Sequence, residues 1–142
     1  MKKILLLSIF VFISLCITES ADIGFVVRVI DGDTIELENG EIIRLIGIDA
    51  PEWGEYCYEE ATEKLEELII NKNIRLESDV RKFDNYDRSL RYVYLGNMFV
   101  NFEMVRSGYA FSWTLEPNTK HSKELENAEI FAKENKLGCL WS

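Results

Sequence analysis

The distribution of hydrophobic and polar positions predicts a chain rich in short β-strands. β-Branched and other apolar residues gather in short runs, and turn residues such as Asn39-Gly40 separate them. Three runs follow one another through tight turns, which is the pattern of an antiparallel meander. The five predicted strands are residues 24–30, 34–37, 41–48, 73–77 and 90–95.

Three other segments repeat apolar residues with helical spacing. This pattern predicts helices at residues 58–70, 101–107 and 122–135, with Gly108 ending the second and Gly138 the third. The element order predicts an α+β fold that is mainly β, in which a five-stranded barrel of the oligonucleotide/oligosaccharide-binding (OB) type carries three packed helices. A mixed open sheet is the alternative.

The N-terminal segment has the pattern of a secretory signal peptide. Lys2 and Lys3 precede an apolar run over residues 4–17, and the chain then becomes polar. This run is shorter than the roughly 20 residues that a membrane-spanning helix requires. A buried core helix is disfavoured, because a helix that is apolar on every face has little place in so small a domain.

The small residues Thr18 and Ser20 fit a cleavage site before Ala21. We therefore interpret residues 1–20 as a signal peptide and residues 21–142 as one secreted domain, expected to be a monomer without stable membrane association. In the alternative, an uncleaved signal or a lipid anchors the protein to a membrane.

The cysteine count depends on this cleavage, because Cys16 lies in the segment that it would remove. Leu15 stands where a lipid-attachment signal usually has a small residue, which disfavours lipidation of Cys16. Cys57 and Cys139 then remain as an even pair, which predicts a disulfide in an exported protein. Two separate buried thiols are the alternative.

The acidic charge of the chain argues against tight non-specific binding to nucleic acid. The full chain carries −9, and removal of Lys2, Lys3 and Glu19 with the signal leaves −10. So acidic a body repels polyphosphate at long range. Phosphate binding must then come from a few local cations and a bound metal, so catalysis on a phosphate substrate is not excluded.

Three short segments concentrate residues suited to metal and phosphate chemistry. Each has an ordinary explanation, since Asp-Gly-Asp is a common turn and a lone arginine is usually a surface residue. Their combination in one small domain favours a shared site instead. The segments are residues 31–34 (DGDT), 44–52 (RLIGIDAPE) and 84–88 (DNYDR).

A hairpin would bring Asp33, before the second strand, beside Asp49, after the third. Two neighbouring carboxylates repel unless a cation lies between them, and oxygen ligands favour calcium or magnesium. Arg44 is five residues from Asp49, so either a bend near Gly47 or an end of the strand before Asp49 must bring their side chains together. Zinc is disfavoured, because His121 is the only histidine and no cysteine cluster accompanies it.

The three segments, in this order and spacing, resemble the staphylococcal nuclease (thermonuclease) family, and the resemblance extends from about residue 24 to residue 141. It implies a calcium-dependent endonuclease that hydrolyses DNA and RNA and leaves 3′-phosphates. The implied metal ligands are Asp33, Asp49 and the backbone carbonyl of Ala50, where the family's best-known member has threonine.

The resemblance also implies the catalytic and substrate-binding residues. Arg44 and Arg88 would stabilise the charge that builds on the phosphate, and Glu52 would orient or deprotonate the attacking water. Tyr86 matches a substrate-binding tyrosine of the family. Two base-stacking tyrosines are not matched, and Trp113 is the nearby aromatic residue that best replaces them, with Phe111 a weaker candidate.

Two further features differ from the family. The loop between Glu52 and the helix at residue 58 is shorter than the mobile loop of the family, which affects substrate access. The acidic charge of the chain contrasts with the strongly basic type member.

Two other classes of function compete with the enzyme. A barrel of this type can be a non-catalytic module that binds nucleic acid or protein, but a nucleic-acid module would carry a basic, aromatic-rich groove. A calcium-stabilised export protein without turnover would need Asp33 and Asp49 but not Arg44, Glu52 and Arg88. The presence of all five residues favours the nuclease.

Overall fold

The computed structural model describes residues 22–142. Residues 1–21, with the predicted signal peptide and its cleavage site, lie outside the described residues, so the boundary of the mature domain stays a prediction. None of the helices within residues 22–142 combines the length and the apolar character of a membrane span.

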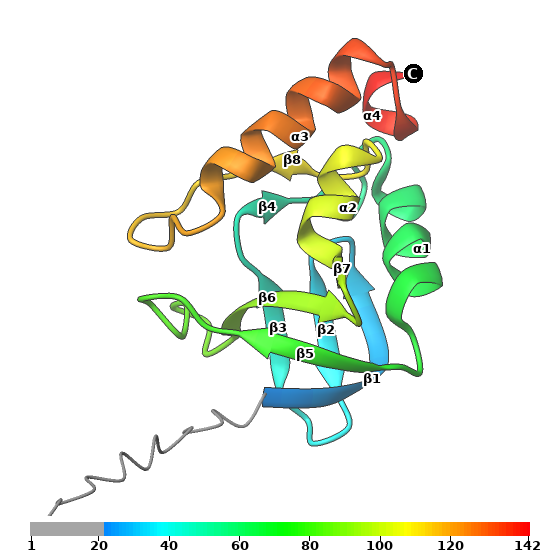
Figure 1. The fold of residues 1–142 in the computed structure, drawn as a ribbon. Coiled ribbons are helices and arrows are strands. Elements are labelled where there is room, and N and C mark those ends of the chain that lie inside the picture. Colours follow the sequence, from blue (N-terminus) through cyan, green and yellow to red (C-terminus); the bar gives the residue numbers. More distant parts are fainter. Residues whose placement is uncertain (1–21) are drawn as a thin grey trace, which may run out of the picture.

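The secondary structure follows the predicted order, with additional short elements (Figure 1). The strands are β1 (Asp22–Asp31), β2 (Thr34–Leu37), β3 (Ile42–Leu45), β4 (Ile48–Asp49), β5 (Asn73–Glu77), β6 (Ser89–Leu95), β7 (Met98–Phe99) and β8 (Phe111–Ser112). The helices are α1 (Tyr58–Ile69), α2 (Val100–Arg106), α3 (Ser122–Glu134) and α4 (Gly138–Trp141).

Five strands close into a barrel in the order β3-β2-β1-β5-β6, and β3 pairs with β6 to complete it. The closing pair is parallel, with Ile43 opposite Ser89 and Leu45 opposite Arg91, whereas the other barrel pairs are antiparallel. The five-stranded barrel is therefore confirmed, and the alternative of a mixed open sheet is wrong.

The long strand β1 belongs to both halves of the barrel. Its first residues pair with β5, and its second half, from Val26 to Asp31, pairs with β2. The register shifts between Val26 and Arg28, and such a bulge bends a strand so that it can turn a corner of a barrel.

The core fills the barrel and the space beneath the helices. Alternate residues of β3 and β5 are buried, as the period of two requires, whereas β6 is buried at consecutive positions from Ser89 to Val93. Helix α1 adds Ala61, Leu65 and Ile69, and α2 adds Met104 and Val105, all fully buried. Figure 1 shows these helices packed around one end of the barrel, with α3 crossing above α2.

The predicted third strand, residues 41–48, is interrupted in the structure. β3 ends at Leu45, Gly47 adopts a left-handed conformation with φ of 80°, and the short strand β4 then pairs with β8 instead of with the barrel. Such a φ value is easy for glycine and costly for other residues. The bend expected near Gly47 is therefore present.

The predicted role of Gly138 is wrong. Helix α3 ends at Glu134, and Gly138 begins the additional helix α4 with φ of 63°. A side chain at this position would collide with the backbone of Gly108, so the close approach of the two segments explains the glycine.

Helix α4 brings Cys139 to Cys57, which precedes α1. The structure pairs the two sulfurs, and the Cα atoms lie 5.6 Å apart, within the usual range for disulfides of about 4.4–6.8 Å. We propose that this disulfide links the C-terminus to the loop between β4 and α1 across a sequence separation of 82 residues.

Replacement of both cysteines, Cys57→Ser with Cys139→Ser, is expected to lower the free energy of unfolding by about 3–5 kcal/mol, because the unfolded chain regains the entropy of an open loop. Guanidinium denaturation of the oxidised protein and the double variant measures this difference. Mass spectrometry without reductant should also show peptides containing both cysteines. Equal stability of the two proteins, with free thiols in the wild type, would contradict the proposal.

Candidate active site

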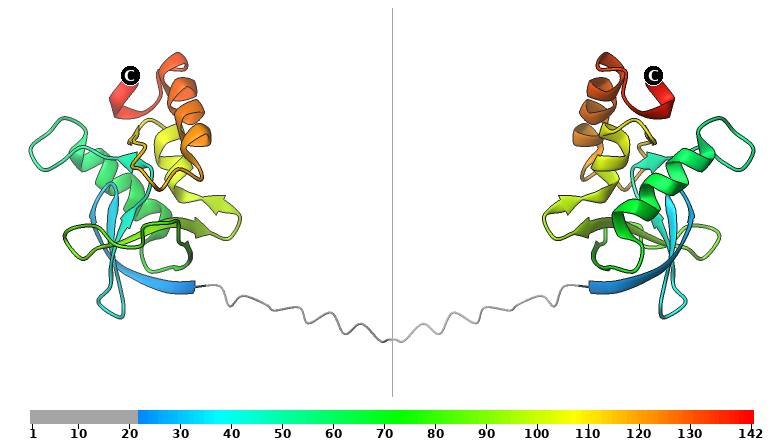
Figure 2. Two further views of the ribbon diagram at one scale, coloured as in Figure 1. Left: turned by 90° about the vertical axis from the view of Figure 1, so that its left-hand side faces the viewer. Right: turned by 90° about the vertical axis from the view of Figure 1, so that its right-hand side faces the viewer.

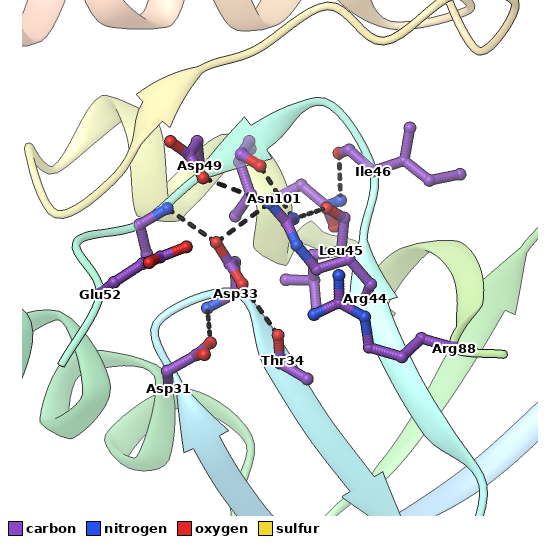
Figure 3. A network of polar contacts seen from close by, with 12 residues as sticks. Asp31, Asp33, Thr34, Arg44, Leu45, Ile46, Asp49, Glu52, Arg88 and Asn101 are labelled. Atoms are coloured by element: carbon purple, nitrogen blue, oxygen red, sulfur yellow. Dashed lines mark hydrogen bonds and ion pairs between the residues drawn. The ribbon is translucent and has the colours of Figure 1, made fainter. Parts of the chain in front are cut away.

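Asp33 occupies the turn between β1 and β2 and is 6% exposed. Its Oδ2 accepts a hydrogen bond from the Ala50 amide at 2.8 Å, and its Oδ1 accepts one from the Thr34 hydroxyl at 2.9 Å. Its own amide donates to Asp31 Oδ1 at 3.0 Å (Figure 3). The carboxylate is thus fixed by Thr34, at the start of β2, and by Ala50, directly after β4.

Arg44 on β3 joins the two aspartates that the sequence predicted as neighbours (Figure 3). Its Nη2 lies 3.2 Å from Asp33 Oδ2 and 3.4 Å from Asp49 Oδ1. Its Nη1 donates to the carbonyls of Leu45 at 2.6 Å and Ile48 at 2.9 Å. Backbone carbonyls on either side of the bend at residues 46–47 therefore hold the guanidinium in place before any ligand binds.

Burial opposes ionisation of both aspartates. Desolvation raises the pKa of Asp33 to about 7, although the charge of Arg44 lowers it, and the charge of Asp31 raises it further. Desolvation also raises the pKa of Asp49, against the lowering effect of Arg44, and the charge of Glu55 adds to the rise. The charge of Arg44 therefore does not offset the combined effect of burial and of the neighbouring carboxylates on these two pKa values.

Glu52 lies in the loop between β4 and α1, which projects from the body of the protein in both views of Figure 2. Its amide donates to Glu55 Oε2 at 2.7 Å, and its carbonyl accepts from the Glu55 amide at 2.9 Å. These reciprocal bonds close a tight turn. The side chain of Glu52 is exposed to solvent.

A cavity of about 240 Å³ lies beside this cluster. Its lining includes four of the residues predicted from sequence, namely Arg44, Tyr86, Arg88 and Trp113. Tyr86 is 81% exposed and Trp113 is 57% exposed, so both rings are accessible to a ligand. Asp33 and Asp49, the proposed metal ligands, do not line the cavity. Arg44 lines the cavity and also contacts both aspartates.

Arg88, just before β6, is oriented by Asp84. Its Nε donates to Asp84 Oδ2 at 2.7 Å, and its amide donates to Oδ1 at 3.0 Å. Although burial raises the pKa of Asp84, hydrogen bonds from Arg88 and from the Tyr86 amide lower it below its ordinary value. Within residues 22–142 the terminal nitrogens of Arg88 have no hydrogen-bond partner, so they are available to a phosphate.

The donor set fits a hard divalent cation. Asp33, Asp49 and the nearby Asp31 offer only oxygen atoms, and a cation would relieve the unfavourable ionisation of the buried carboxylate. The part of the chain that the structure describes contains no preassembled group of three or more acidic, histidine or cysteine ligands. Such a site would therefore take its remaining ligands from backbone carbonyls, water and substrate.

Several residues of the site were not predicted from sequence. Asp84 and Glu55 hold the arginine and the glutamate that the sequence predicted, and Arg81 and Asn118 line the cavity. The segment around Asp84 was recognised, but its role depends on hydrogen bonds that no spacing rule reveals. The sequence around Asn118 did not predict its role, because its side chain bonds to the backbone of Arg81, which lies far from it in the chain.

The comparisons with known proteins agree with this geometry. The family model described as "Staphylococcal nuclease homologue" matches residues 42–142. This protein belongs to the staphylococcal nuclease family. The resemblance inferred from the three segments is therefore confirmed.

Several relatives cover most of the chain. The thermonuclease of Staphylococcus hyicus is 33% identical over 130 residues, which covers 82% of this chain and 74% of the relative. The thermonuclease of Staphylococcus intermedius is 34% identical over 123 residues, covering 80% and 73%. The SPbeta prophage-derived endonuclease YokF of Bacillus subtilis is 34% identical over 126 residues, covering 81% of this chain and 42% of the relative.

The raised pKa of Asp33 predicts a pH-dependent stability in the absence of metal. The folded protein holds the proton more tightly than the unfolded chain, so this contribution is full below about pH 4 and is lost as the pH rises through 7. Asp33→Asn removes this loss, which amounts to up to about 4 kcal/mol. Urea denaturation with chelator at pH 5 and pH 8 measures it.

Asp87→Asn is a matched control, since Asp87 is exposed and its positive φ of 58° is also accessible to asparagine. Its unfolding free energy should change with pH as in the wild type. The same pH dependence in Asp33→Asn would show that the buried carboxyl is not the group that titrates.

Proposed function

We propose that this protein is a secreted, calcium-dependent endonuclease that hydrolyses phosphodiester bonds of DNA and RNA. Membership of the staphylococcal nuclease family and the similarity to thermonucleases support this proposal. The observation that carries it is the contact of Arg44 with Asp33 and Asp49 at the edge of a cavity that also contains Arg88. This arrangement combines an anion site with an acidic oxygen cluster.

In this proposal Arg44 and Arg88 are the catalytic cations. Both line the cavity; carboxylates hold both in position, and backbone carbonyls also hold Arg44. Charge that develops on phosphate oxygens in the transition state is therefore met by donors that need not reorganise. The free terminal nitrogens of Arg88 are suited to bidentate binding of phosphate.

Glu52 is proposed to accept a proton from the attacking water or to orient that water. Its side chain is solvent-exposed, so water has access to it, and it follows by two residues Ala50, whose amide donates to Asp33. The turn closed by Glu55 limits how far Glu52 can move. General-base assistance of this type contributes about 10²–10⁴-fold to a rate.

The proposed ligands of calcium are Asp33, Asp49 and the backbone carbonyl of Ala50. A bound calcium ion supplies Lewis acidity toward a phosphate oxygen and neutralises the acidic cluster. The Ala50 amide donates to Asp33, so the chain segment that supplies the carbonyl is already fixed against the aspartate. The methyl side chain of Ala50 does not prevent coordination, since only its backbone takes part.

Secretion rests on the sequence pattern of residues 1–20. The proposed disulfide supports it independently, because disulfides persist in oxidising compartments. The protein is proposed to act as a monomer on nucleic acid outside the cell.

Residues 21–142 should degrade single-stranded DNA when calcium is present and should lose this activity with chelator. Glu52→Gln should lower kcat by about 10²–10⁴-fold, because the amide cannot accept the proton of water. Arg88→Lys should lower it by about 10²–10³-fold, because the forked donor geometry is lost. Release of acid-soluble nucleotides measures each rate.

Glu66→Gln, on the exposed face of α1, is the matched control and should leave the rate unchanged. A wild-type protein that cleaves neither DNA nor RNA at any calcium concentration would exclude the enzyme. Activity that survives in Glu52→Gln would exclude Glu52 as the base while leaving the nuclease intact.

A further inference from the structure

Arg81 differs from the other arginines in how its charge is compensated. All seven arginines lie within residues 22–142. Arg106 stacks its guanidinium on the Phe131 ring at 4.4 Å. Ion pairs with carboxylates hold Arg28, Arg44, Arg75, Arg88 and Arg91. Within the described residues, Arg81 alone has neither partner, although acidic residues outnumber basic ones by 25 to 16 in the chain.

The side chain of Arg81 is held by neutral acceptors only. Its Nε donates to the Phe83 carbonyl at 2.9 Å, and its Nη2 donates to Asn85 Oδ1 at 2.8 Å. A guanidinium has five N–H donors, so most of them stay free for a ligand. The charge is therefore positioned without being neutralised.

The backbone of Arg81 is fixed by a buried side chain. Asn118, which is 1% exposed, accepts from the Arg81 amide at 2.7 Å and donates to the Arg81 carbonyl at 2.8 Å. Such a two-bond clamp resembles a short strand pairing and leaves the position of the residue well defined. Both Arg81 and Asn118 line the same cavity as Arg44 and Arg88.

We propose that Arg81 binds a second phosphate of the substrate strand, adjacent to the phosphate that Arg44 and Arg88 hold. This inference rests on the proposed function, because it assigns the cavity to a polynucleotide. Tyr86 and Trp113 in the same lining supply aromatic faces for the nucleoside between the two phosphates. In a protein this acidic, an uncompensated arginine in the cavity is the means by which a further phosphate is attracted.

The first test measures binding without turnover. A fluorescein-labelled single-stranded oligothymidylate is titrated with Glu52→Gln protein in calcium, with and without Arg81→Gln, and anisotropy is recorded at several salt concentrations. Arg81→Gln should weaken binding by about tenfold or more, because a charge-assisted hydrogen bond is lost. The slope of log K against log salt should become shallower by about 0.7, as expected for one phosphate contact on a single strand.

Lys82→Gln is the matched control, because this neighbouring cation is exposed and does not line the cavity. It should leave affinity and slope nearly unchanged. Thermal unfolding of Arg81→Gln should stay close to that of the parent, since the hydrogen bonds lost are exposed and Asn118 contacts only the backbone of residue 81. An Arg81→Gln protein with parental affinity and salt slope would overturn the proposal, and so would a parent protein that does not bind the oligonucleotide.

A second test uses thymidine dinucleotides with a terminal phosphate at the 5′ end, at the 3′ end or at neither. One of the two terminal phosphates should lower KM for the wild type by about tenfold, and Arg81→Gln should abolish this advantage while kcat changes little. A wild type that gains from neither phosphate would overturn the proposal. Binding of oligothymidylate without any cleavage would instead refute the nuclease and leave the role of Arg81 to the binding test.

Discussion

The parallel pairing of β3 with β6 is the constraint on which the rest of the site depends. It closes the barrel and sets Arg44 opposite Leu90, two residues after Arg88. Without this pairing the two arginines would lie on separate parts of an open sheet. Asn101, fully buried, reinforces the junction, because it donates to the Ile46 carbonyl at 2.8 Å and accepts from the Val93 amide at 2.9 Å. A buried polar side chain satisfied on both sides holds two strands in one relative position.

The acidic cluster is fixed by the fold at a cost in electrostatic free energy. Asp33 is held by the Ala50 amide and by Arg44, yet burial still raises its pKa to about 7. Desolvation therefore outweighs the positive charge of Arg44, and the ionised form of Asp33 is left only partly compensated. The same interactions that define the barrel therefore leave a local deficit that a divalent cation can satisfy, and this links the fold to the proposed metal chemistry.

Local pattern was sufficient for most elements, because strand and helix periods are properties of short segments. The limits of α1 and α3 agree with the expected helices to within one residue, and β2 and β5 agree completely. The short strands β4 and β8 were not predicted as separate elements, since a strand of two residues has no detectable period. The interruption at Gly47 was expected only because Arg44 and Asp49 had to share one face.

The convergence of the three charged segments could be predicted only with the help of the family resemblance, because parallel β3–β6 pairing joins residues far apart in the chain. The roles of Asp84, Glu55 and Asn118 could not be predicted, since each acts by orienting another residue through hydrogen bonds that form only in the folded protein. The structure gives the positions of the proposed metal-binding and catalytic residues, whereas their chemical roles remain predictions.

The overall negative charge and a polyanionic substrate are compatible because charge acts locally in this protein. Several basic side chains are paired with carboxylates on the surface, where such pairs contribute little attraction at a distance. Three arginines gather at one cavity, where Arg44 is paired with Asp33 and Asp49, Arg88 is paired with Asp84, and only neutral groups hold Arg81. Attraction is thereby confined to one cavity of about 240 Å³. An acidic exterior then disfavours non-productive binding elsewhere on the surface, so a strand is retained only where its phosphates meet these cations.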